Sequence, residues 1–436
     1  MAQRGAMAHI TLITAGSRGD VQPYIALALG LTAAGHTPRL ATHALYADWV
    51  RGHGLDFYPI EGDPLAMAQG QSGREWMETG RRGFGLLGGF REFMAPLLGQ
   101  ATQDLLAACA DADLILFAGT TFFAAYSVAE KLNLPFVQAY LQPVNPTREF
   151  PSLVYPTRFR GGALFNYATH AVGGQLFWQM MRPVLNRIRR EQLGLRSLSV
   201  PGPFIAMMRR RLPVILGYSP TVLPKPRDWN EAQIVTGFWF MPDQTYEPPG
   251  ELARFLAGGP PPVYVGFGSM TGNDPARLTD ITLEALRLSG RRGVLLSGWA
   301  GLAEGDLSDS ILRLDAVPHD WLFPRMAAVV HHGGIGTTHT GLRAGVPNVI
   351  VPFFGDQPFW GDRVHALGAG PRPVLQSDLT AEHLAEAIGA ATSDGTMRAR
   401  AAEVGRQIQA EDGVGEAVQI VNRYLAQRPK FFDGIK

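Results

Sequence analysis

Two stretches of the chain show the same order of apolar runs and glycine turns. In the first, an apolar run at 10–14 meets a glycine-rich turn, and a helical pattern over about 23–34 ends at Gly35 before a second apolar run. In the second, an apolar run at 263–267 is followed by a glycine turn and a helical pattern over 275–288. Proline early in a helix and glycine just beyond its end are typical helix boundaries. Apolar strands that alternate with helices in this way predict parallel sheets covered on both faces.

These two stretches predict an α/β fold of two doubly wound domains in tandem. Between them the chain is rich in proline and has no long periodic run, which places a linker at 242–250. The expected N-terminal domain is 1–241, and the expected C-terminal domain is 251–413. The last helical pattern lies in 414–436, and we expect this segment to pack back toward the N-terminal domain.

Two segments, 61–100 and 145–215, have a less regular pattern and hold many aromatic and methionine residues. Most of these side chains are expected in the core, and some are expected to line an apolar pocket of the first domain. They are Phe84, Phe90, Phe93, Met94, Phe159, Phe165, Tyr167, Phe177, Trp178, Met180 and Met181. The longest uncharged apolar run, 114–129, predicts a strand, a turn and a helix, and is short for a membrane span.

Composition narrows the class of protein. The 436 residues are 46% hydrophobic and 18% charged, an ordinary globular balance, and the net charge of +1 argues against a nucleic-acid partner. Two basic runs, 187–191 and 208–212, are expected to be solvated helix faces, with peripheral contact to an acidic membrane surface as the alternative. The single cysteine, Cys109, allows no disulfide within the chain, and the start lacks the apolar stretch of a signal peptide. We expect a cytoplasmic protein without an integral membrane segment.

The clearest candidate chemistry lies in the stretch "HHGGIGTTHTG", at 331–341. An apolar strand is expected at 327–330, and the glycines make a sharp turn into a helix over 337–344. A glycine turn that leads into a helix N-terminus presents free backbone N–H groups and the positive end of the helix dipole. The pattern therefore predicts an anion site, most often for phosphate.

The histidines of this stretch raise the alternative of a metal site. His331 and His332 are adjacent, so their side chains point to opposite faces of an extended strand, and His339 lies roughly two turns down the helix. The stretch holds no Cys, Asp or Glu to complete a tetrahedral set of ligands. We therefore favour the anion site and expect His331 and His339 to be structural residues.

A second polar pair follows the next strand, in "VPFFGDQPFWGDRV". Asp356 and Gln357 lie just past the carboxyl end of a strand, where α/β folds bind ligands. A carboxylate accepts hydrogen bonds and an amide both donates and accepts them, so the pair can bracket vicinal hydroxyls. Near a phosphate turn this suggests a sugar attached to a diphosphate. For Asp356 alone, a capped turn is the alternative.

At these residues the chain resembles a known family. The stretch "VPHDWLFPRMAAVVHHGGIGTTHTGLRAGVPNVIVPFFGDQPFWGDRV" resembles the donor-binding signature of the two-domain UDP-glycosyltransferases of GT-B fold. The motifs "GSRGDVQPYIALALGL" and "PRDWNEAQIVTGFWF" are similar to those of sterol 3-β-glucosyltransferases and of bacterial glycosyltransferases of antibiotic biosynthesis. The resemblance covers nearly the whole chain. It implies two facing Rossmann-like domains with the active site in the cleft between them.

The resemblance implies a role for each matching position. The residues that would hold the donor diphosphate are His332, Gly334, Gly336 and Thr337. Ser269, in the turn "FGSM", would approach the diphosphate from the other glycine-rich loop. Asp356 and Gln357 would bind the sugar hydroxyls, and Val317 with its neighbouring backbone would face the base.

Two positions depart from the plant members of this family. The plant signature has a tryptophan under the base where this chain has Ala316, and a glutamate on the ribose where it has Thr340. The sterol and antibiotic relatives share both differences. UDP is the expected nucleotide, and a dTDP-deoxysugar is the alternative.

The implied reaction is inverting transfer of a sugar, glucose in the first instance, to a hydroxyl group. Asp20 occupies the place where plant relatives carry a histidine base, and it would remove the proton of the acceptor as its oxygen attacks the anomeric carbon. An alternative role for Asp20 is a helix cap, since the helix is expected to begin two or three residues later. The apolar segments favour a lipophilic acceptor such as a sterol, triterpenoid, polyketide or flavonoid.

No metal or other cofactor is expected beside the UDP-sugar co-substrate. Positive charge would come from the backbone N–H groups of 334–337, the helix dipole and His332. The acidic motif "DAD" at 111–113 precedes an apolar strand, so it is expected at the amino end of that strand, away from the ligand edge.

Two other classes of function remain open for this nucleotide-sugar site. One is a hydrolase or epimerase that uses the same site, and the other is a protein that senses nucleotide sugars. A Ser/His/Asp hydrolase is poorly supported, because no strand–"GxSxG"–helix turn occurs in the sequence.

Overall fold

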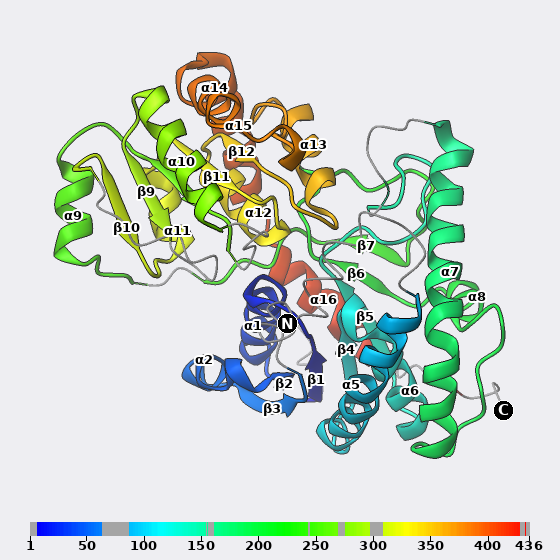
Figure 1. The fold of residues 1–436 in the computed structure, drawn as a ribbon. Helices are drawn as coiled ribbons and strands as arrows, with labels where there is room; N and C mark the ends of the chain where they lie inside the picture. Colours follow the sequence, from blue (N-terminus) through cyan, green and yellow to red (C-terminus); the bar gives the residue numbers. More distant parts are fainter. Residues whose placement is uncertain are drawn as a thin grey trace.

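The computed structural model shows two α/β domains, each built on its own parallel sheet (Figure 1). The structure describes residues 7–62, 87–153, 155, 161–242, 245–268, 275–296, 308–427 and 432, with the backbone alone described for 87–96 and Ile205. Ser269 therefore lies outside the described residues. The α/β class and the two-domain organisation expected from the sequence are confirmed.

The described part of the first domain holds a sheet in the order β3-β2-β1-β4-β5-β6-β7, with every neighbouring pair parallel. Its strands are β1 (His9–Ile13), β2 (Thr37–His43), β3 (Asp56–Ile60), β4 (Leu114–Phe117), β5 (Phe136–Tyr140), β6 (Val214–Leu216) and β7 (Gln233–Val235). The strand order reverses between β1 and β4. Because ligands of open α/β sheets bind outside the carboxyl ends of the strands at such a reversal, the turn after β1 is well placed for a site.

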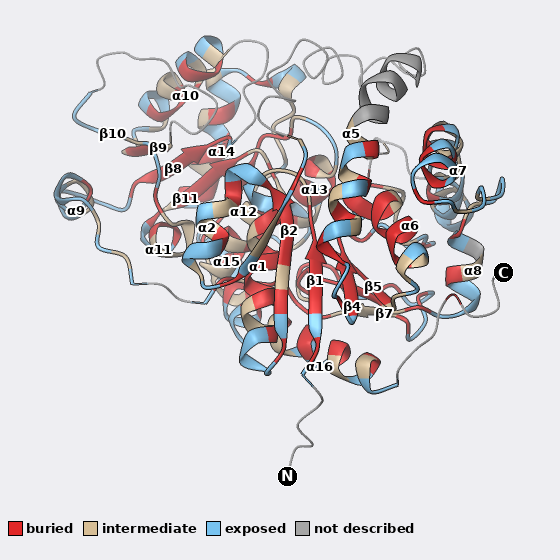
Figure 2. Cartoon of the chain, turned by 90° about the horizontal axis from the view of Figure 1, so that it is seen from below, coloured by how far each residue is buried: buried red, intermediate tan, exposed pale blue. Residues whose placement is uncertain are grey.

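Helices cover both faces of this sheet, which is why its central strands are apolar on both sides. All of β4 and β5 is buried, and Figure 2 shows the central strands mostly in the colour of buried residues, beside helices that carry exposed residues. The covering helices are α1 (Arg18–Ala33), α2 (Ala47–Gly52), α5 (Leu87–Ala108), α6 (Phe122–Leu132), α7 (Gly162–Glu191) and α8 (Phe204–Arg209), with the 3-10 turns η1 (Ala44–Tyr46) and η3 (Gly119–Thr121).

The described part of the second domain holds a parallel sheet in the order β10-β9-β8-β11-β12. Its strands are β8 (Val263–Gly266), β9 (Gly293–Leu296), β10 (Ile311–Leu314), β11 (Ala328–His331) and β12 (Asn348–Ile350). Its helices are α9 (Gly250–Ala257), α10 (Pro275–Ser289), α11 (His319–Leu322), α12 (Ile335–Arg343), α13 (Gln357–Ala366), α14 (Ala381–Ser393) and α15 (Gly395–Gln409), with the 3-10 turns η4 (Phe323–Arg325) and η5 (Gln376–Asp378). Since β8 and β11 are neighbours, the glycine turns at their carboxyl ends lie side by side.

The last helix of the chain, α16 (Gly413–Ala426), packs against α1 of the first domain. A Cβ added to Gly30 of α1 would lie 2.3 Å from a methyl group of Val414, so the two helices approach closely. His36, after α1, hydrogen-bonds Asn422 of α16 at 2.6 Å. The chain thus returns from the second domain to the first.

The start of α1 differs from the sequence-based expectation. The helix begins at Arg18 and not near Pro23, because Ser17 and Asp20 form a capping box in which the Asp20 carboxyl accepts the N–H of Ser17 at 2.8 Å and the N–H of Asp20 donates to Ser17 O at 2.9 Å. Asp20 is therefore inside the first turn of α1, whereas the sequence pattern placed it before the helix.

The segment 145–215 also differs, because 30 of its residues form the single long helix α7. Trp178 and Met181 are buried in the core, where most of this set was expected, whereas Tyr167 and Phe177 are 41% and 47% exposed and do not belong to the core. The side chains of Phe84, Phe90, Phe93, Met94 and Phe159 lie outside the described residues. No helix of the described ranges is long and apolar enough to cross a membrane.

Candidate active site

The glycine turn after β11 opens directly into α12. Gly334 is the N-cap, with extended backbone angles (φ −60°, ψ 142°), and the first turn contains no acidic residue. The N–H groups of Ile335, Gly336 and Thr337 have no partner within the helix, whereas Thr338 N donates to Gly334 O at 2.9 Å. Because no acidic side chain of the first turn offsets the positive end of the helix dipole, this helix end can bind an anion such as a phosphate group.

His332 lies between the two glycine turns of the second domain. A Cβ added to Gly334 would be 2.4 Å from its Nε2, and one added to Gly268 would be 3.3 Å from its Cε1. Burial lowers the pKa of His332 to about 4, so the ring is neutral near pH 7 in the free protein. The positive charge expected of His332 is therefore absent, but a neutral imidazole still donates one hydrogen bond. Its buried Nδ1 has no partner in the described part of the chain.

Two other histidines of the stretch have both ring nitrogens occupied. His331 bonds Asn348 Oδ1 through Nε2 at 2.9 Å and accepts the N–H of Gly333 at Nδ1, 3.1 Å away. His339 bonds the carbonyl of Ile335 through Nδ1 at 2.8 Å and accepts the N–H of Ser219 at Nε2, 3.2 Å away. Both residues are structural, as expected.

A metal site is not supported by these histidines. Within the described residues, no three His, Cys, Asp or Glu side chains are grouped so that they could hold a metal ion. The ring nitrogens of His331 and His339 already serve the backbone and Asn348.

The N-terminus of α1 faces the N-terminus of α12 across the two domains. A Cβ added to Gly336 would lie 3.9 Å from the Cα of Gly19, and the two helices pack against each other. In Figure 1 the two helices meet where the domains face each other. The motif "GSRGD" of the first domain and the glycine turn of the second therefore form one site.

The two oxygens of the Asp20 carboxyl have different surroundings. Oδ2 accepts hydrogen bonds from Ser17 N at 2.8 Å and Ser17 Oγ at 2.9 Å. Oδ1 has no hydrogen bond within the described ranges. Burial raises the pKa of Asp20, and the two bonds from Ser17 oppose that rise. The helix cap and a proton acceptor are thus compatible, because each role uses its own oxygen.

Asp356 lies close enough to Asp20 for their charges to interact. Its Oδ2 accepts the indole N–H of Trp360 at 2.9 Å. Burial raises the pKa of Asp356 to about 6, and repulsion by Asp20 adds to the rise. The side chain of Gln142, just after β5, hydrogen-bonds the Asp356 carboxyl, and this bond opposes the rise in pKa. Groups from both domains therefore meet at this carboxyl.

Gln357 is oriented differently from Asp356. It is 5% exposed, and its Oε1 accepts the N–H groups of Phe353 and Phe354, at 2.7 and 3.2 Å. The carbonyl of the side chain is therefore used to hold the turn before α13. Its amide nitrogen has no hydrogen bond in the described chain and is the group that remains for a ligand.

The remaining candidate positions lie along the same edge of the second domain. The side chain of Val317 is buried in the core formed by β8, β9 and α11, so only its backbone can face a ligand. Ala316 is exposed beside it, and Thr340 is half-buried on α12. Ser269 cannot be assigned, because it falls outside the described residues.

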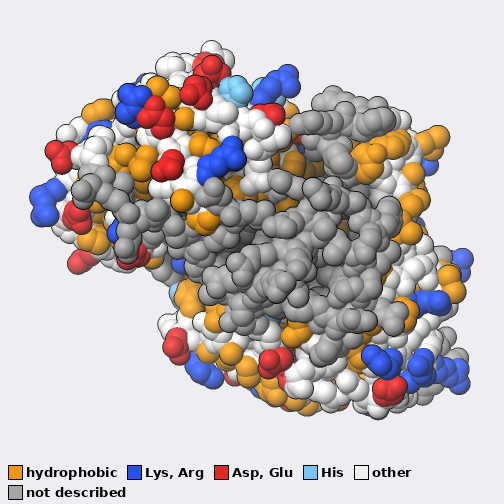
Figure 3. All heavy atoms as spheres, viewed as in Figure 1, with side chains coloured by type: hydrophobic (Ala, Val, Ile, Leu, Met, Phe, Trp, Pro, Cys, Tyr) orange, Lys and Arg blue, Asp and Glu red, His pale blue; other side chains and the backbone are white. Residues whose placement is uncertain are grey.

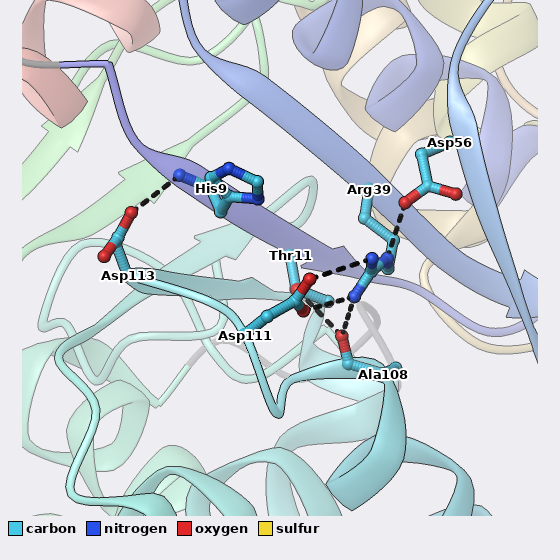
Figure 4. Close-up of polar contacts among 7 residues, drawn as sticks. All are labelled: His9, Thr11, Arg39, Asp56, Ala108, Asp111 and Asp113. Atoms are coloured by element: carbon cyan, nitrogen blue, oxygen red, sulfur yellow. Dashed lines mark hydrogen bonds and ion pairs between the residues drawn. The ribbon is translucent and has the colours of Figure 1, made fainter.

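The carboxylates of the "DAD" motif lie at the opposite edge of the first sheet (Figure 4). Asp113 accepts the N–H of His9, the first residue of β1, at 2.8 Å. Asp111 pairs with Arg39, which also binds Asp56 at 2.6 Å. Both carboxylates are held at the amino ends of the strands, while Asp20 lies beyond their carboxyl ends.

Three residues of the site were not identified from the sequence. Gln142 and Trp360 contact Asp356, and Arg18 lies with its guanidinium 4.9 Å from the ring centroid of Trp49. Burial is the larger cause that lowers the pKa of His319, and the charge of Arg18 lowers it further. Arg18 belongs to the "GSRGD" motif, so the sequence pattern could have indicated it. No motif surrounds Gln142, so the sequence could not indicate that residue.

Family models match both halves of the chain. The model described as glycosyltransferase family 28 N-terminal domain matches residues 10–151, and the model described as erythromycin biosynthesis protein CIII-like, C-terminal domain, matches residues 300–423.

Curated relatives are similar over nearly all of the chain. A sterol 3-beta-glucosyltransferase of Neosartorya fischeri is 38% identical over 430 residues, which is 96% of this chain and 29% of that protein. One of Cryptococcus neoformans is 37% identical over 447 residues, which is 95% of this chain and 27% of that protein. The chain thus spans about three tenths of the length of these relatives.

Solved structures share the two-domain architecture. The glycotransferase of kitacinnamycin has a TM-score of 0.70 at 19% identity, covering 96% of this chain and 99% of that one. The glycosyltransferase SnogD from Streptomyces nogalater has a TM-score of 0.66 at 20% identity, covering 96% and 100%. The fold is that of a two-domain α/β protein with its candidate site where the two domains meet. The two halves of the chain thus match glycosyltransferase-type family models, nearly the whole chain is similar to part of the sterol 3-beta-glucosyltransferases, and its fold is that of solved two-domain (GT-B) glycosyltransferases.

Proposed function

We propose that this protein transfers a sugar from a UDP-sugar to the hydroxyl group of a lipophilic acceptor, with inversion at the anomeric carbon. One observation carries the proposal: the N-terminus of α12, which has no acidic residue in its first turn, faces the N-terminus of α1, whose first turn carries Asp20, across the two domains. A site for a diphosphate and a site for a proton acceptor are the two parts that this reaction needs.

In this mechanism Asp20 Oδ1 takes the proton of the acceptor hydroxyl while the acceptor oxygen attacks the anomeric carbon. The attack comes from the face opposite the diphosphate, so the configuration inverts. Asp356 and the amide nitrogen of Gln357 hold the sugar hydroxyls. The raised pKa of Asp20 is consistent with a base that binds a proton more readily than an exposed aspartate does.

The diphosphate leaving group gains negative charge as the bond to the sugar breaks. The N–H groups of Ile335, Gly336 and Thr337 and the neutral ring of His332 would donate hydrogen bonds to it. These groups are fixed by the fold before the reaction. We propose that no metal ion takes part, because the paired carboxylates Asp111 and Asp113 lie at the other edge of the sheet.

The acceptor and the sugar are proposed from the relatives. Sterol 3-beta-glucosyltransferases match 96% of the chain at 38% identity, which favours glucose as the sugar and a sterol as the acceptor. Two of the solved structures, those of VinC and SsfS6 in complex with dTDP, share the fold at 20% and 21% identity. A dTDP-sugar therefore remains the second candidate donor.

One experiment tests the proposal. The purified protein is incubated with UDP-glucose or dTDP-glucose and with ergosterol, cholesterol or a polyketide alcohol, and product masses are measured. We expect a hexosyl sterol with UDP-glucose. Free glucose without a conjugate would instead indicate a hydrolase. UDP-glucose binding without any turnover would indicate a sensor.

A further inference from the structure

An apolar surface lies on the outer side of α7, α8 and their connection. Eight of the thirteen large hydrophobic side chains that are exposed in the described part of the chain come from residues 164–208, and each is 38–78% exposed. We call them the α7–α8 face: Leu164, Tyr167, Val172, Leu176, Phe177, Val200, Phe204 and Met208. Figure 3 shows hydrophobic side chains gathered over this side of the molecule. Such a concentration marks an interaction surface.

The elements of the α7–α8 face are fixed against one another. The carbonyl of Val200 accepts hydrogen bonds from Gln175, Trp178 and Gln179 of α7, at 2.9, 2.8 and 2.7 Å. The ring of Phe204 on α8 lies 6.2 Å from that of Trp178. The connection and α8 therefore rest on α7, and their exposed side chains belong to one surface.

Spacing along α7 places apolar side chains on one side of the helix. Leu164, Val172 and Leu176 follow each other at multiples of four residues, and Ala168 fills the remaining step. Residues four apart lie on the same face of a helix. The hydrophobic side chains are thus presented as a stripe to the outside.

The same segment of the chain carries several exposed arginines and almost no acidic residues. Between 162 and 213 the sequence contains one acidic residue, Glu191. The exposed arginines in this range are Arg187, Arg190, Arg196, Arg209, Arg210 and Arg211. Arg189 is the exception to the solvated basic face expected from the sequence: its side chain is 1% exposed and bonds Glu130 at 2.9 Å. Apolar side chains beside exposed arginines are the combination that an anionic lipid surface binds.

We propose that the α7–α8 face docks this protein on an anionic lipid bilayer. The apolar side chains enter the headgroup region, and the arginines contact the lipid phosphates. A second copy of the chain is a poorer occupant. A symmetric contact between two copies would bring the same arginine-rich patches together, and like charges that face each other oppose association.

The position of α7 connects this surface to the candidate active site. Asn166 and Thr169 of α7 hold the segment 148–152, through hydrogen bonds of 3.0 Å to Arg148 O and 2.8 Å from Ser152 N. The ring of Phe150 in that segment lies 5.3 Å from Phe359 of α13, the neighbour of Trp360. If the proposed function holds, a lipophilic acceptor would be taken from the bilayer on the side where α7 meets the site.

The test measures binding of the whole protein to lipid vesicles by co-sedimentation, with no donor or acceptor present. Vesicles are made of phosphatidylcholine alone or mixed with phosphatidylglycerol. Leu176→Glu is compared with Leu288→Glu on α10, since the two leucines are 48% and 45% exposed. Arg209→Glu/Arg211→Glu is compared with Arg313→Glu/Arg398→Glu, two exposed arginines of the second domain.

We expect binding to the anionic vesicles that weakens with salt. Both variants of the α7–α8 face should weaken it by about tenfold or more, and both controls should leave it unchanged. Equal binding by all four variants would overturn the proposal. The proposal would also be overturned if the unmodified protein bound no vesicles and sedimented as a dimer that Leu176→Glu dissociated. Co-sedimentation needs no turnover, so it tests this inference independently of the proposed function. If the protein binds vesicles but glycosylates no acceptor, the proposed function is refuted and this inference stands.

Discussion

At the scale of single residues, Asp20 caps a helix and is also the base in the proposed mechanism. Its Oδ2 accepts both hydrogen bonds from Ser17 and caps α1, while Oδ1 has no hydrogen bond among the described residues. Gly16 permits this geometry: its φ is +140°, and a Cβ there would lie 2.4 Å from Oδ2. The sequence left open whether Asp20 caps the helix or acts as a base. The two roles are compatible, because each would use a different oxygen of the carboxyl.

Asp20→Asn separates the capping role of this residue from its proposed role as the base. An amide oxygen still accepts from Ser17, so α1 should remain capped and the melting temperature should be nearly unchanged. Transfer should fall by a factor of order hundreds, because the amide cannot take a proton. Turnover and UDP affinity, measured on the same preparation, check this. Near-normal turnover would leave Asp20 with the capping role alone.

Asp356 predicts a pH dependence of stability. Its pKa is about 6 in the folded protein and near 4 when unfolded, so the folded state binds the proton more tightly. Its contribution to stability is therefore complete below about pH 4 and is lost as the pH rises to about 6. Asp356→Asn imitates the protonated form and should raise the melting temperature at pH 8 by a few degrees, with no gain near pH 4. Asp362→Asn, exposed on the same helix, is the control. Destabilisation at every pH would show that the carboxylate itself is required.

His332 and His339 should respond oppositely to truncation. His332→Ala removes the proposed donor to the diphosphate and should weaken UDP binding about tenfold, with little change in melting temperature. His339→Ala removes a fully buried ring that stacks on Phe238 at 4.8 Å and bonds Ser219 of the first domain. We expect a loss of roughly 2–4 kcal/mol of stability with UDP affinity retained. Calorimetric titration and thermal melting distinguish the two, and equal losses of UDP affinity would revive a shared role.

At the scale of elements, the strands and helices beside glycine turns could be predicted closely from the sequence. β8 and α10 begin at the expected residues, 263 and 275. Each apolar run is short and ends at a glycine, so the local pattern and the final structure agree. The start of α1 was missed because a capping box depends on the geometry of Ser17 and Asp20, which resembles a turn in the sequence.

The helix α7 could not be predicted, for a reason that its environment explains. Its exposed side carries Val172, Leu176 and Phe177, so apolar residues surround the helix and its periodicity is weak. Pro183 and a pair of glycines interrupt the pattern further. In the candidate site the same limit applies to Gln142, which reaches Asp356 only after the two domains meet.

The glycine turn before α12 can be tested as an element. In Gly334→Ala the added Cβ would lie 2.4 Å from Nε2 of His332. The ring must move, and UDP affinity should fall by at least about tenfold. Gly389→Ala on α14 is the matched control, since nothing lies within 4 Å of the added Cβ. It should keep UDP affinity and gain about 0.5–1 kcal/mol of helix stability. Normal affinity in Gly334→Ala would show that the turn does not position His332 for the nucleotide.

At the scale of the whole molecule, the two sheets place the charged groups at different edges. The carboxyl ends of β1 and β11 lead to the facing N-termini of α1 and α12, where Gly336 approaches Gly19. The amino ends of the first sheet carry the pairs of Arg39 with Asp56 and Asp111 (Figure 4). The parallel arrangement therefore separates a region suited to anions from a region of paired carboxylates.

This separation predicts that transfer needs no divalent cation. A cation at the diphosphate would need carboxylate ligands near α12, but its first turn has no acidic residue. Asp111 and Asp113, the pair with the right spacing, are bound to Arg39 and to the backbone of β1 at the far edge. The fixed N–H groups of α12 would then stabilise the departing diphosphate, and they need no rearrangement during the reaction. Exhaustive EDTA treatment should therefore leave most of the transfer rate, and Asp113→Asn should behave in the same way. If EDTA abolished transfer and magnesium or manganese restored it, a cation would have to bind at the diphosphate, and the helix end alone would not be sufficient for the reaction.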